Sequence, residues 1–155
     1  MNTQENPLGE FAGHTDVGSP KLPGSATHDA ARQEYTLAAT GTNPASDCFP
    51  FQFIWKKMEG DFILRARAEF IGPADGDHPA IGWMARPGLD GGARFVNGAR
   101  HGEDGASLQF RRSPGAGTEQ LALPVTNPDV LQFERKGATF IFSAAVFISP
   151  SSPAK

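Results

Sequence analysis

The sequence has 155 residues, of which 39% are hydrophobic and 20% are charged, and its formal net charge is −3. This length is enough for one domain whose hydrophobic core needs neither a metal nor a disulfide. The net negative charge provides no general attraction for nucleic acid, so no nucleic-acid partner is expected. The single cysteine, Cys48, excludes an intramolecular disulfide and a cysteine-rich zinc site. No apolar run approaches the roughly 18 residues of a membrane-spanning helix, so we expect a soluble chain, while its cellular location stays open.

Composition also bounds the fold class. The 18 glycines and 13 prolines interrupt the chain too often for long helices, whereas the 12 phenylalanines favour short strands. Candidate strands recur at a spacing of about ten residues without helical crossovers. The sequence therefore predicts an all-β protein, and specifically an antiparallel β-sandwich.

The first candidate elements lie in the N-terminal third. Residues 1–23 contain only isolated apolar residues and predict an irregular lead-in with at most one edge strand. Residues 25–37 predict two short strands joined by a turn from Asp29 to Gln33, and a short helix is the competing interpretation.

The strongest core signal is an alternation of aromatic residues, in which Phe49, Phe51, Phe53 and Trp55 share one face of a strand. A turn at residues 57–61 follows. We expect this strand to form a hairpin with the next one, residues 62–70.

The remaining strands follow in the second half of the chain. Residues 89–98 are rich in glycine and predict a loop. The clearest hairpin joins two strands through Arg135–Ala138, and residues 148–155 form a Ser/Pro tail after a sandwich domain of residues 24–147. The predicted strands are 81–86, 107–111, 119–123, 130–134 and 139–144.

Several segments together resemble a bacterial family of concanavalin A-like jelly-roll domains, whose members carry TolB-like or "regulation of enolase" labels. These segments are Phe53–Lys57, Gly60–Arg67, Ile81–Arg86, Ser107–Arg112 and Glu134–Gly137. The resemblance implies two curved antiparallel sheets and a concave face that in many such domains receives a glycan. It also implies further strands after residues 142–147, where this chain has its Ser/Pro tail. The sandwich is then smaller or lacks C-terminal strands, and its open edges could pair with another chain.

Strand parity predicts a polar platform on one sheet face. If the strands are neighbours, the side chains that point away from Phe62, Trp83 and Phe110 lie together, and arginine among them suits a carboxylate or sulfate ligand. The competing interpretation is a solvated face neutralised by glutamates. The candidate ligand-binding residues are Arg65, Arg67, Met84, Arg86, Gln109 and Arg111, with His101 on an adjoining loop.

The residues give less support to calcium binding, glycoside hydrolysis or polysaccharide lyase activity. Asp75–Asp77 and Asp90–Gly92 could offer oxygen ligands to calcium, but neither completes a calcium-loop pattern, and both suit ordinary turns, so no cofactor is assigned. The acidic-hydrophobic-acidic motif of jelly-roll glucanases is absent. A polysaccharide lyase would need residue types that Arg65, Gln109, His101 and Tyr35 supply, but the Gln-x-His signature of jelly-roll alginate lyases is missing.

The sequence therefore predicts a sandwich module that binds a carbohydrate, including an acidic glycan, without transforming it. Catalytic residues are not assigned. Three alternatives stay open: a lyase, a self-associating structural module, and an incomplete domain without activity of its own.

Overall fold

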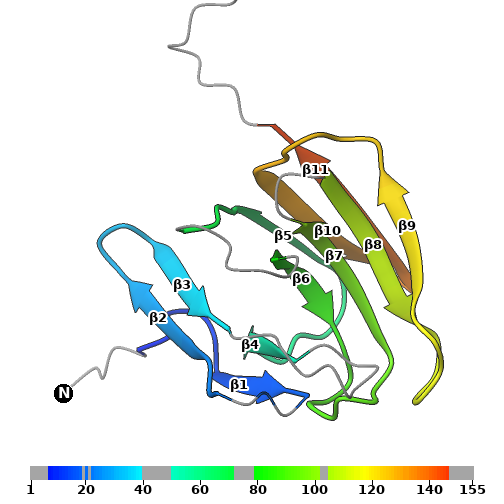
Figure 1. Cartoon of the computed structure of the whole chain (residues 1–155), viewed down its shortest axis with the longest axis horizontal. Coiled ribbons are helices and arrows are strands. Elements are labelled where there is room, and N and C mark those ends of the chain that lie inside the picture. The colour runs from blue at the N-terminus through cyan, green and yellow to red at the C-terminus, as the bar shows by residue number, and fades with distance from the viewer. Residues whose placement is uncertain are drawn as a thin grey trace, which may run out of the picture. The chain divides into compact units, whose positions relative to one another are not determined.

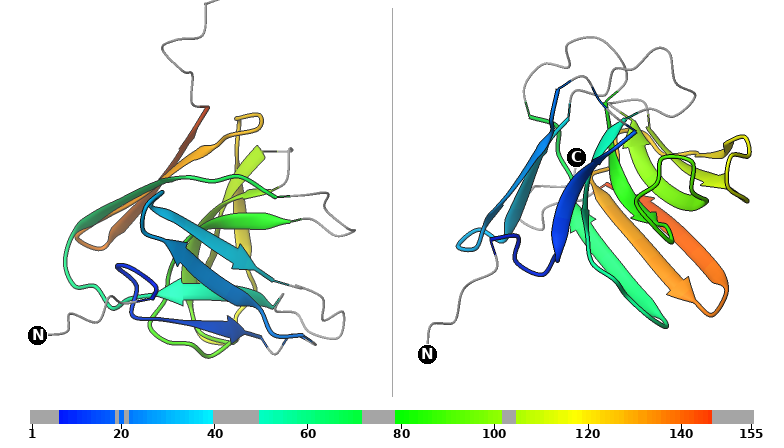
Figure 2. Two further views of the ribbon diagram at one scale, coloured as in Figure 1. Left: turned by 90° about the vertical axis from the view of Figure 1, so that its left-hand side faces the viewer. Right: turned by 90° about the horizontal axis from the view of Figure 1, so that it is seen from below.

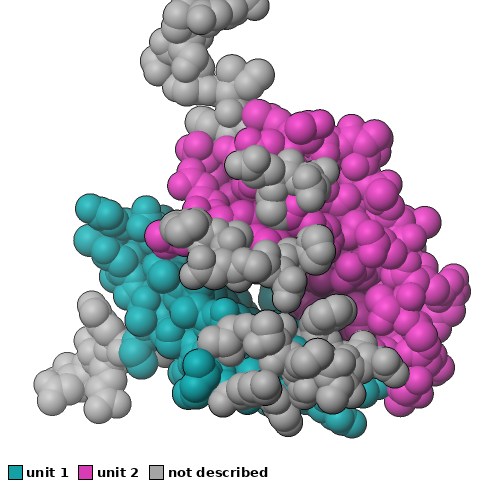
Figure 3. Space-filling view, in the orientation of Figure 1, with its two compact units in different colours: residues 1–59, 88–92 teal, residues 60–87, 93–155 magenta. Residues whose placement is uncertain are grey.

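The computed structural model describes residues 7–18, 20, 22–39, 50–71, 79–101 and 105–146. Within these ranges the chain forms eleven strands and no helix, and all strand pairs are antiparallel (Figure 1). The prediction of an all-β antiparallel protein is confirmed. No helix in the described part of the chain is long and apolar enough to cross a membrane. Figure 3 colours the two compact units of the chain, Met1–Glu59 with Gly88–Gly92, and Gly60–Pro87 with Ala93–Lys155.

Unit 1 contains two strand pairs. Strand β1 (Gly13–Val17) pairs with β4 (Phe51–Trp55), and β2 (Ser25–Asp29) pairs with β3 (Glu34–Ala38). The turn between β2 and β3 is closed by the Asp29 carboxylate, which accepts hydrogen bonds from the backbone N–H groups of the next turn residues. The predicted pair of strands with a turn at Asp29–Gln33 is confirmed, and the helical alternative is wrong.

Polar contacts connect the two pairs of unit 1. The Asp16 carboxylate on β1 accepts hydrogen bonds from the Gln52 side chain at 2.8 Å and from the Gly24 N–H at 2.9 Å, just before β2. Phe11 packs edge-on against Tyr35 of β3, with ring centroids 5.0 Å apart. The lead-in thus supplies both a paired strand and an aromatic anchor.

Unit 2 is a β-sandwich of two sheets (Figure 2). One sheet has three strands in the order β11-β10-β5, and the other is a meander of four strands in the order β6-β7-β8-β9. The bounds are β5 (Phe62–Arg67), β6 (Ala80–Ala85), β7 (Phe95–His101), β8 (Gly105–Arg111), β9 (Glu119–Leu123), β10 (Val130–Lys136) and β11 (Thr139–Ala145).

The core of unit 2 lies between these two sheets. Phe133 and Leu131 of β10 are 0% and 1% exposed. The Trp83 indole N–H of β6 donates to the Leu131 carbonyl at 3.0 Å, across the sandwich. Gly98 of β7 faces the ring of Phe142 on β11 so closely that a side chain at position 98 would overlap the ring. Trp83 and Gly98 therefore mark the inner face of the four-stranded sheet.

Two predictions about individual strands are wrong. The aromatic strand does not form a hairpin with residues 62–70, because β4 pairs with β1 in unit 1 while β5 pairs with β10 in unit 2. Residues 95–98 are not loop, because they begin β7, which pairs on both sides. β7 contains Gly98 and Ala99 at its centre, and these small residues obscure the apolar alternation that would predict a strand. Phe49, Cys48 and residues 148–155 lie outside the described residues.

Candidate functional site

The four-stranded sheet of unit 2 has a polar face on the side away from the core. Residues directly opposite each other in antiparallel strands share a face. Since Trp83 and Gly98 point inward, the residues next to them in sequence, Met84 and Asn97, point outward. Four of the predicted site residues lie on this outer face: Met84, His101, Gln109 and Arg111.

An unbroken row of side chains crosses the outer face. Met84, Asn97, Gln109 and Gln120 lie opposite one another in register, one from each of the four strands. We call Asn97, Gln109 and Gln120 the amide row. The Gln109 amide donates to the Gln120 side-chain oxygen at 3.2 Å. Since adjacent strands lie about 4.8 Å apart, the row from β6 to β9 spans about 14 Å. It offers both hydrogen-bond donors and acceptors along its length.

The next row across the same face consists of small side chains. Gly82, Ala99, Ser107 and Ala122 lie in register there. Ala99 and Ser107 are 2% and 1% exposed, so other atoms of the protein cover them almost completely. The amide row therefore borders a strip of small residues whose two central members are buried, while Gly82 and Ala122 at its ends are exposed.

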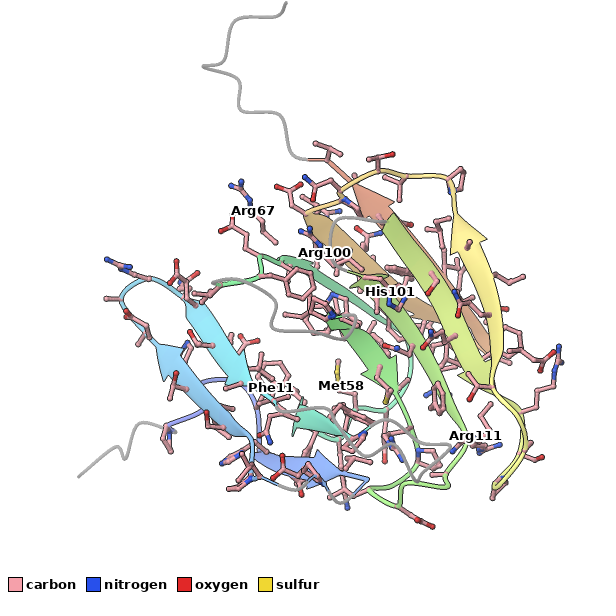
Figure 4. All side chains as sticks on the ribbon, viewed as in Figure 1. Phe11, Met58, Arg67, Arg100, His101 and Arg111 are labelled. Carbon is pink, nitrogen blue, oxygen red and sulfur yellow. The ribbon has the colours of Figure 1, made fainter. Side chains whose placement is uncertain are left out.

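His101 lies beyond this strip, at the end of β7, where Figure 4 shows it beside Arg100. A ring nitrogen of His101 lies 2.6 Å from the Ser107 hydroxyl oxygen. Ser107 is too deeply buried to act as a nucleophile on a bulky substrate. The pair therefore positions the imidazole at the border of the strip, and the prediction that His101 lies in a loop is wrong, because it is the last residue of β7.

The arginines near this face are turned toward the protein itself. Arg111 is 7% exposed, its guanidinium donates to the Ala93 carbonyl at 3.2 Å, and it lies over the ring of Phe95. Arg86, after the end of β6, contacts the sulfur of Met84 at 3.5 Å. Neither guanidinium forms an exposed cationic surface of the kind that an anionic ligand needs.

The predicted platform does not include Arg65 and Arg67. Its premise, that β5 neighbours β6 and β8, is wrong, because β5 lies in the three-stranded sheet. Both arginines point to the outside of that sheet. Arg65 donates to the Gln132 side-chain oxygen at 2.9 and 2.6 Å, and Arg67 pairs with Asp129 at 3.0 Å. The competing interpretation, a solvated and internally neutralised face, describes these two residues correctly.

A second polar region lies at one end of unit 2 around Arg100, whose side chain points inward from β7. Its guanidinium donates to the Ala68 carbonyl at 3.0 Å and to the Asn127 side chain at 2.8 Å, and it lies 5.0 Å from the centre of the Phe70 ring. Arg100 therefore links β7 to the segments that follow β5 and precede β10. A pocket of about 350 Å³ opens here, lined by Glu69, Phe70, Arg100, Asn127, Asp129 and Val146.

Sequence analysis missed Asn97, Arg100, Ser107 and Gln120 as members of these regions. Gln120 could have been found by pairing the strands now called β8 and β9, because that pairing places Gln120 opposite Gln109 on the same face. Asn97 is hidden because residues 89–98 predict a loop, and Arg100 is hidden because it belongs to none of the predicted strands. Near the amide row, hydrogen bonding to Glu119 raises the pKa of the exposed Arg112 guanidinium above its ordinary value.

Metal ligands do not gather in the described ranges, where no group of three or more histidine, cysteine or acidic side chains is found. The Asp90 carboxylate accepts a hydrogen bond from the Gly92 N–H at 3.2 Å, which is the geometry of a local turn. Asp75–Asp77 lies outside the described residues.

Comparison of the chain with protein-family models, with curated proteins and with solved structures found no match.

Proposed function

We propose that unit 2 binds a neutral polysaccharide along the amide row, without transforming it. The observation that carries the proposal is the alignment of Asn97, Gln109 and Gln120 across three adjacent strands. Sugar hydroxyls both donate and accept hydrogen bonds, and side-chain amides provide the complementary pair of groups. The concanavalin A-like resemblance of the sequence is in keeping with this function.

The charges favour a neutral ligand over an acidic one. Arg65 and Arg67 belong to the three-stranded sheet and bind Gln132 and Asp129 there. Arg111 is buried and donates to a backbone carbonyl. A neutral ligand held by amides is expected to bind with little dependence on salt, because few ionic contacts are screened.

The test is a glycan array with neutral, uronic and sulfated polysaccharides, read for the native chain and for two folded double variants. Asn97→Ala/Gln109→Ala removes two members of the amide row. Arg65→Ala/Gln132→Ala is the matched control, since it removes a hydrogen-bonded polar pair from the outer face of the other sheet. We expect binding to neutral glycans that only the first variant loses.

Two results would count against the proposal. If the native chain binds no glycan, the carbohydrate function is wrong. If the control variant loses binding and the amide variant keeps it, the binding face is the outer face of the three-stranded sheet.

The lyase alternative is less favoured by the geometry. His101 and Gln109 share the outer face of the four-stranded sheet, but Arg65 lies on a different sheet. A lyase would therefore need another cation to neutralise a uronate carboxylate. Formation of an unsaturated, ultraviolet-absorbing product from a uronic polysaccharide would nevertheless establish lyase activity.

A further inference from the structure

The three-stranded sheet of unit 2 ends in two edge strands, β5 and β11, which differ in their protection. An edge strand exposes unpaired backbone groups, and natural proteins protect it with charges, proline or a short length. β5 carries Arg65 and Arg67 on its outer face. β11 reads Thr-Phe-Ile-Phe-Ser-Ala-Ala over seven residues, with no charged residue, proline or glycine. Of the described strands, only β10 pairs with it.

The edges of the four-stranded sheet are better protected. β9 is five residues long and begins with Glu119, which pairs with Arg112. β6 contains Gly82, where a side chain would overlap the backbone of β7, and an interior glycine weakens a strand. β11 is thus the longest uncharged edge among the described strands of unit 2.

The sequence of β11 is complementary to itself. An antiparallel pair centred on Phe142 places Phe140 opposite Ala144 on the inner face, and Ile141 opposite Ser143 on the outer face. Each large side chain then meets a small one on both faces. The central position pairs two Phe142 rings, and aromatic cross-strand pairs are favourable. Because the strand carries no charge, no like charges meet.

We propose that β11 is a homodimerisation edge: it pairs antiparallel with β11 of a second copy about a two-fold axis at Phe142. The pairing joins two three-stranded sheets into one continuous six-stranded sheet and satisfies the outward backbone groups of both strands. Such an isologous contact closes on itself and stops at the dimer. Ile141 is 42% exposed in the single chain, and the pairing places Ser143 of the second copy beside it. The proposal does not depend on glycan binding, because the amide row lies on the other sheet.

The first test measures mass against concentration by analytical ultracentrifugation. The native chain is expected to pass from monomer to dimer. Ile141→Lys should raise the dimer dissociation constant by about tenfold or more. Each dimer then contains two lysines at the contact, one from each copy, in place of two apolar side chains. Ile63→Lys is a close control: Ile63 is also exposed on the outer face and also lies opposite Glu134, but on the β5 edge. It should leave the dissociation constant within about twofold of native.

Three outcomes would overturn the proposal: a native chain that stays monomeric at millimolar concentration, equal effects of the two lysines, or a stronger effect of Ile63→Lys. A species larger than a dimer would also contradict a closed two-fold contact. Because both isoleucines are solvent-exposed, both variants are expected to remain folded.

The second test addresses the register. In a Cys48→Ser background, Ile141→Cys and Ser143→Cys are prepared as separate chains and mixed under mild oxidation. The proposed pairing places positions 141 and 143 of different copies directly opposite each other, within reach of a disulfide. The mixture should form disulfide-linked dimers faster than either variant alone. Equal rates for the mixture and for each pure variant would exclude this register.

Discussion

At the scale of single residues, Gly98 shows how closely the two sheets of unit 2 approach. The Phe142 ring occupies the space where a side chain at position 98 would begin, so the ring packs directly on the backbone of β7. Glycine is needed here for the close approach and not for an unusual backbone angle, since Gly98 has no positive φ. The sequence alone could not show this, because the partner ring is 44 residues away in β11.

Gly98→Ala is expected to lower the free energy of unfolding by about 1–3 kcal/mol, because the added methyl group must displace the Phe142 ring. Gly117→Ala is the control: no atom lies within 4 Å of its added methyl group and its φ is not positive. It should leave stability unchanged or raise it slightly. Urea denaturation of both variants measures the difference, and equal stabilities would show that the ring does not pack on Gly98.

Arg100 is a second residue whose role depends on its inward orientation. Arg100→Met should destabilise the fold by about 2–3 kcal/mol, because the Ala68 carbonyl and the Asn127 side chain lose a charged donor. Arg94→Met, at an exposed position just before β7, should cost less than about 0.5 kcal/mol. Thermal unfolding of the two variants compares them directly. Similar decreases in the free energy of unfolding for the two variants would mean that the Arg100 contacts do not stabilise the fold.

At the scale of elements, hydrophobic alternation predicts most strands of unit 2, but it predicts pairing only where a tight turn joins two strands. Residues 119–123 are predicted with the bounds that β9 has, and the β10–β11 hairpin is confirmed with slightly longer strands. The pairing of β5 failed because chain neighbours need not be sheet neighbours. β5 pairs with β10, whose residue Glu134 lies opposite Ile63, 71 residues earlier. Only the fold brings such distant segments together.

The same limit explains the outcome for the candidate site. Parity correctly placed Met84, Gln109 and Arg111 on the outer side of their strands. It could not assign Arg65 and Arg67 to a different sheet, because parity tells which face of a strand a residue occupies and not which strand is its neighbour.

The contact between sheets can be tested at Trp83, where an indole hydrogen bond crosses the sandwich. Trp83→Phe should lower the free energy of unfolding by about 1–3 kcal/mol, because the buried Leu131 carbonyl loses its hydrogen-bond donor. Trp55→Phe provides the comparison, since the buried indole N–H of Trp55 has no hydrogen-bond partner among the described residues. Trp55→Phe should lower the free energy of unfolding only through the packing that the larger ring provides. A Trp55 variant that is less stable than the Trp83 variant would show that the indole hydrogen bond to Leu131 contributes little.

At the scale of the whole molecule, the chain combines two compact all-β units, and its polar residues have different roles on the two sheets of unit 2. On the three-stranded sheet, Arg65 and Arg67 bind neighbouring side chains of the same sheet face. On the four-stranded sheet, the amide row lies in register beside a strip of small residues. This division makes the second face the better candidate for a ligand.

Salt dependence distinguishes a neutral from an acidic ligand. We expect the affinity for the best neutral glycan to change less than about twofold between low and high sodium chloride, because the contacts are hydrogen bonds from amides. Isothermal titration calorimetry at two salt concentrations measures this. A steep loss of affinity with salt would instead indicate ionic contacts with a charged ligand.

The most direct test of the central claim is a backbone and side-chain amide NMR titration of the native chain with a neutral oligosaccharide. We predict that the shift changes centre on Asn97, Gln109 and Gln120, with little change at Arg65 and Gln132. Changes centred on Arg65 and Gln132, or no changes with any neutral oligosaccharide, would contradict the assignment of the amide row as a glycan-binding face.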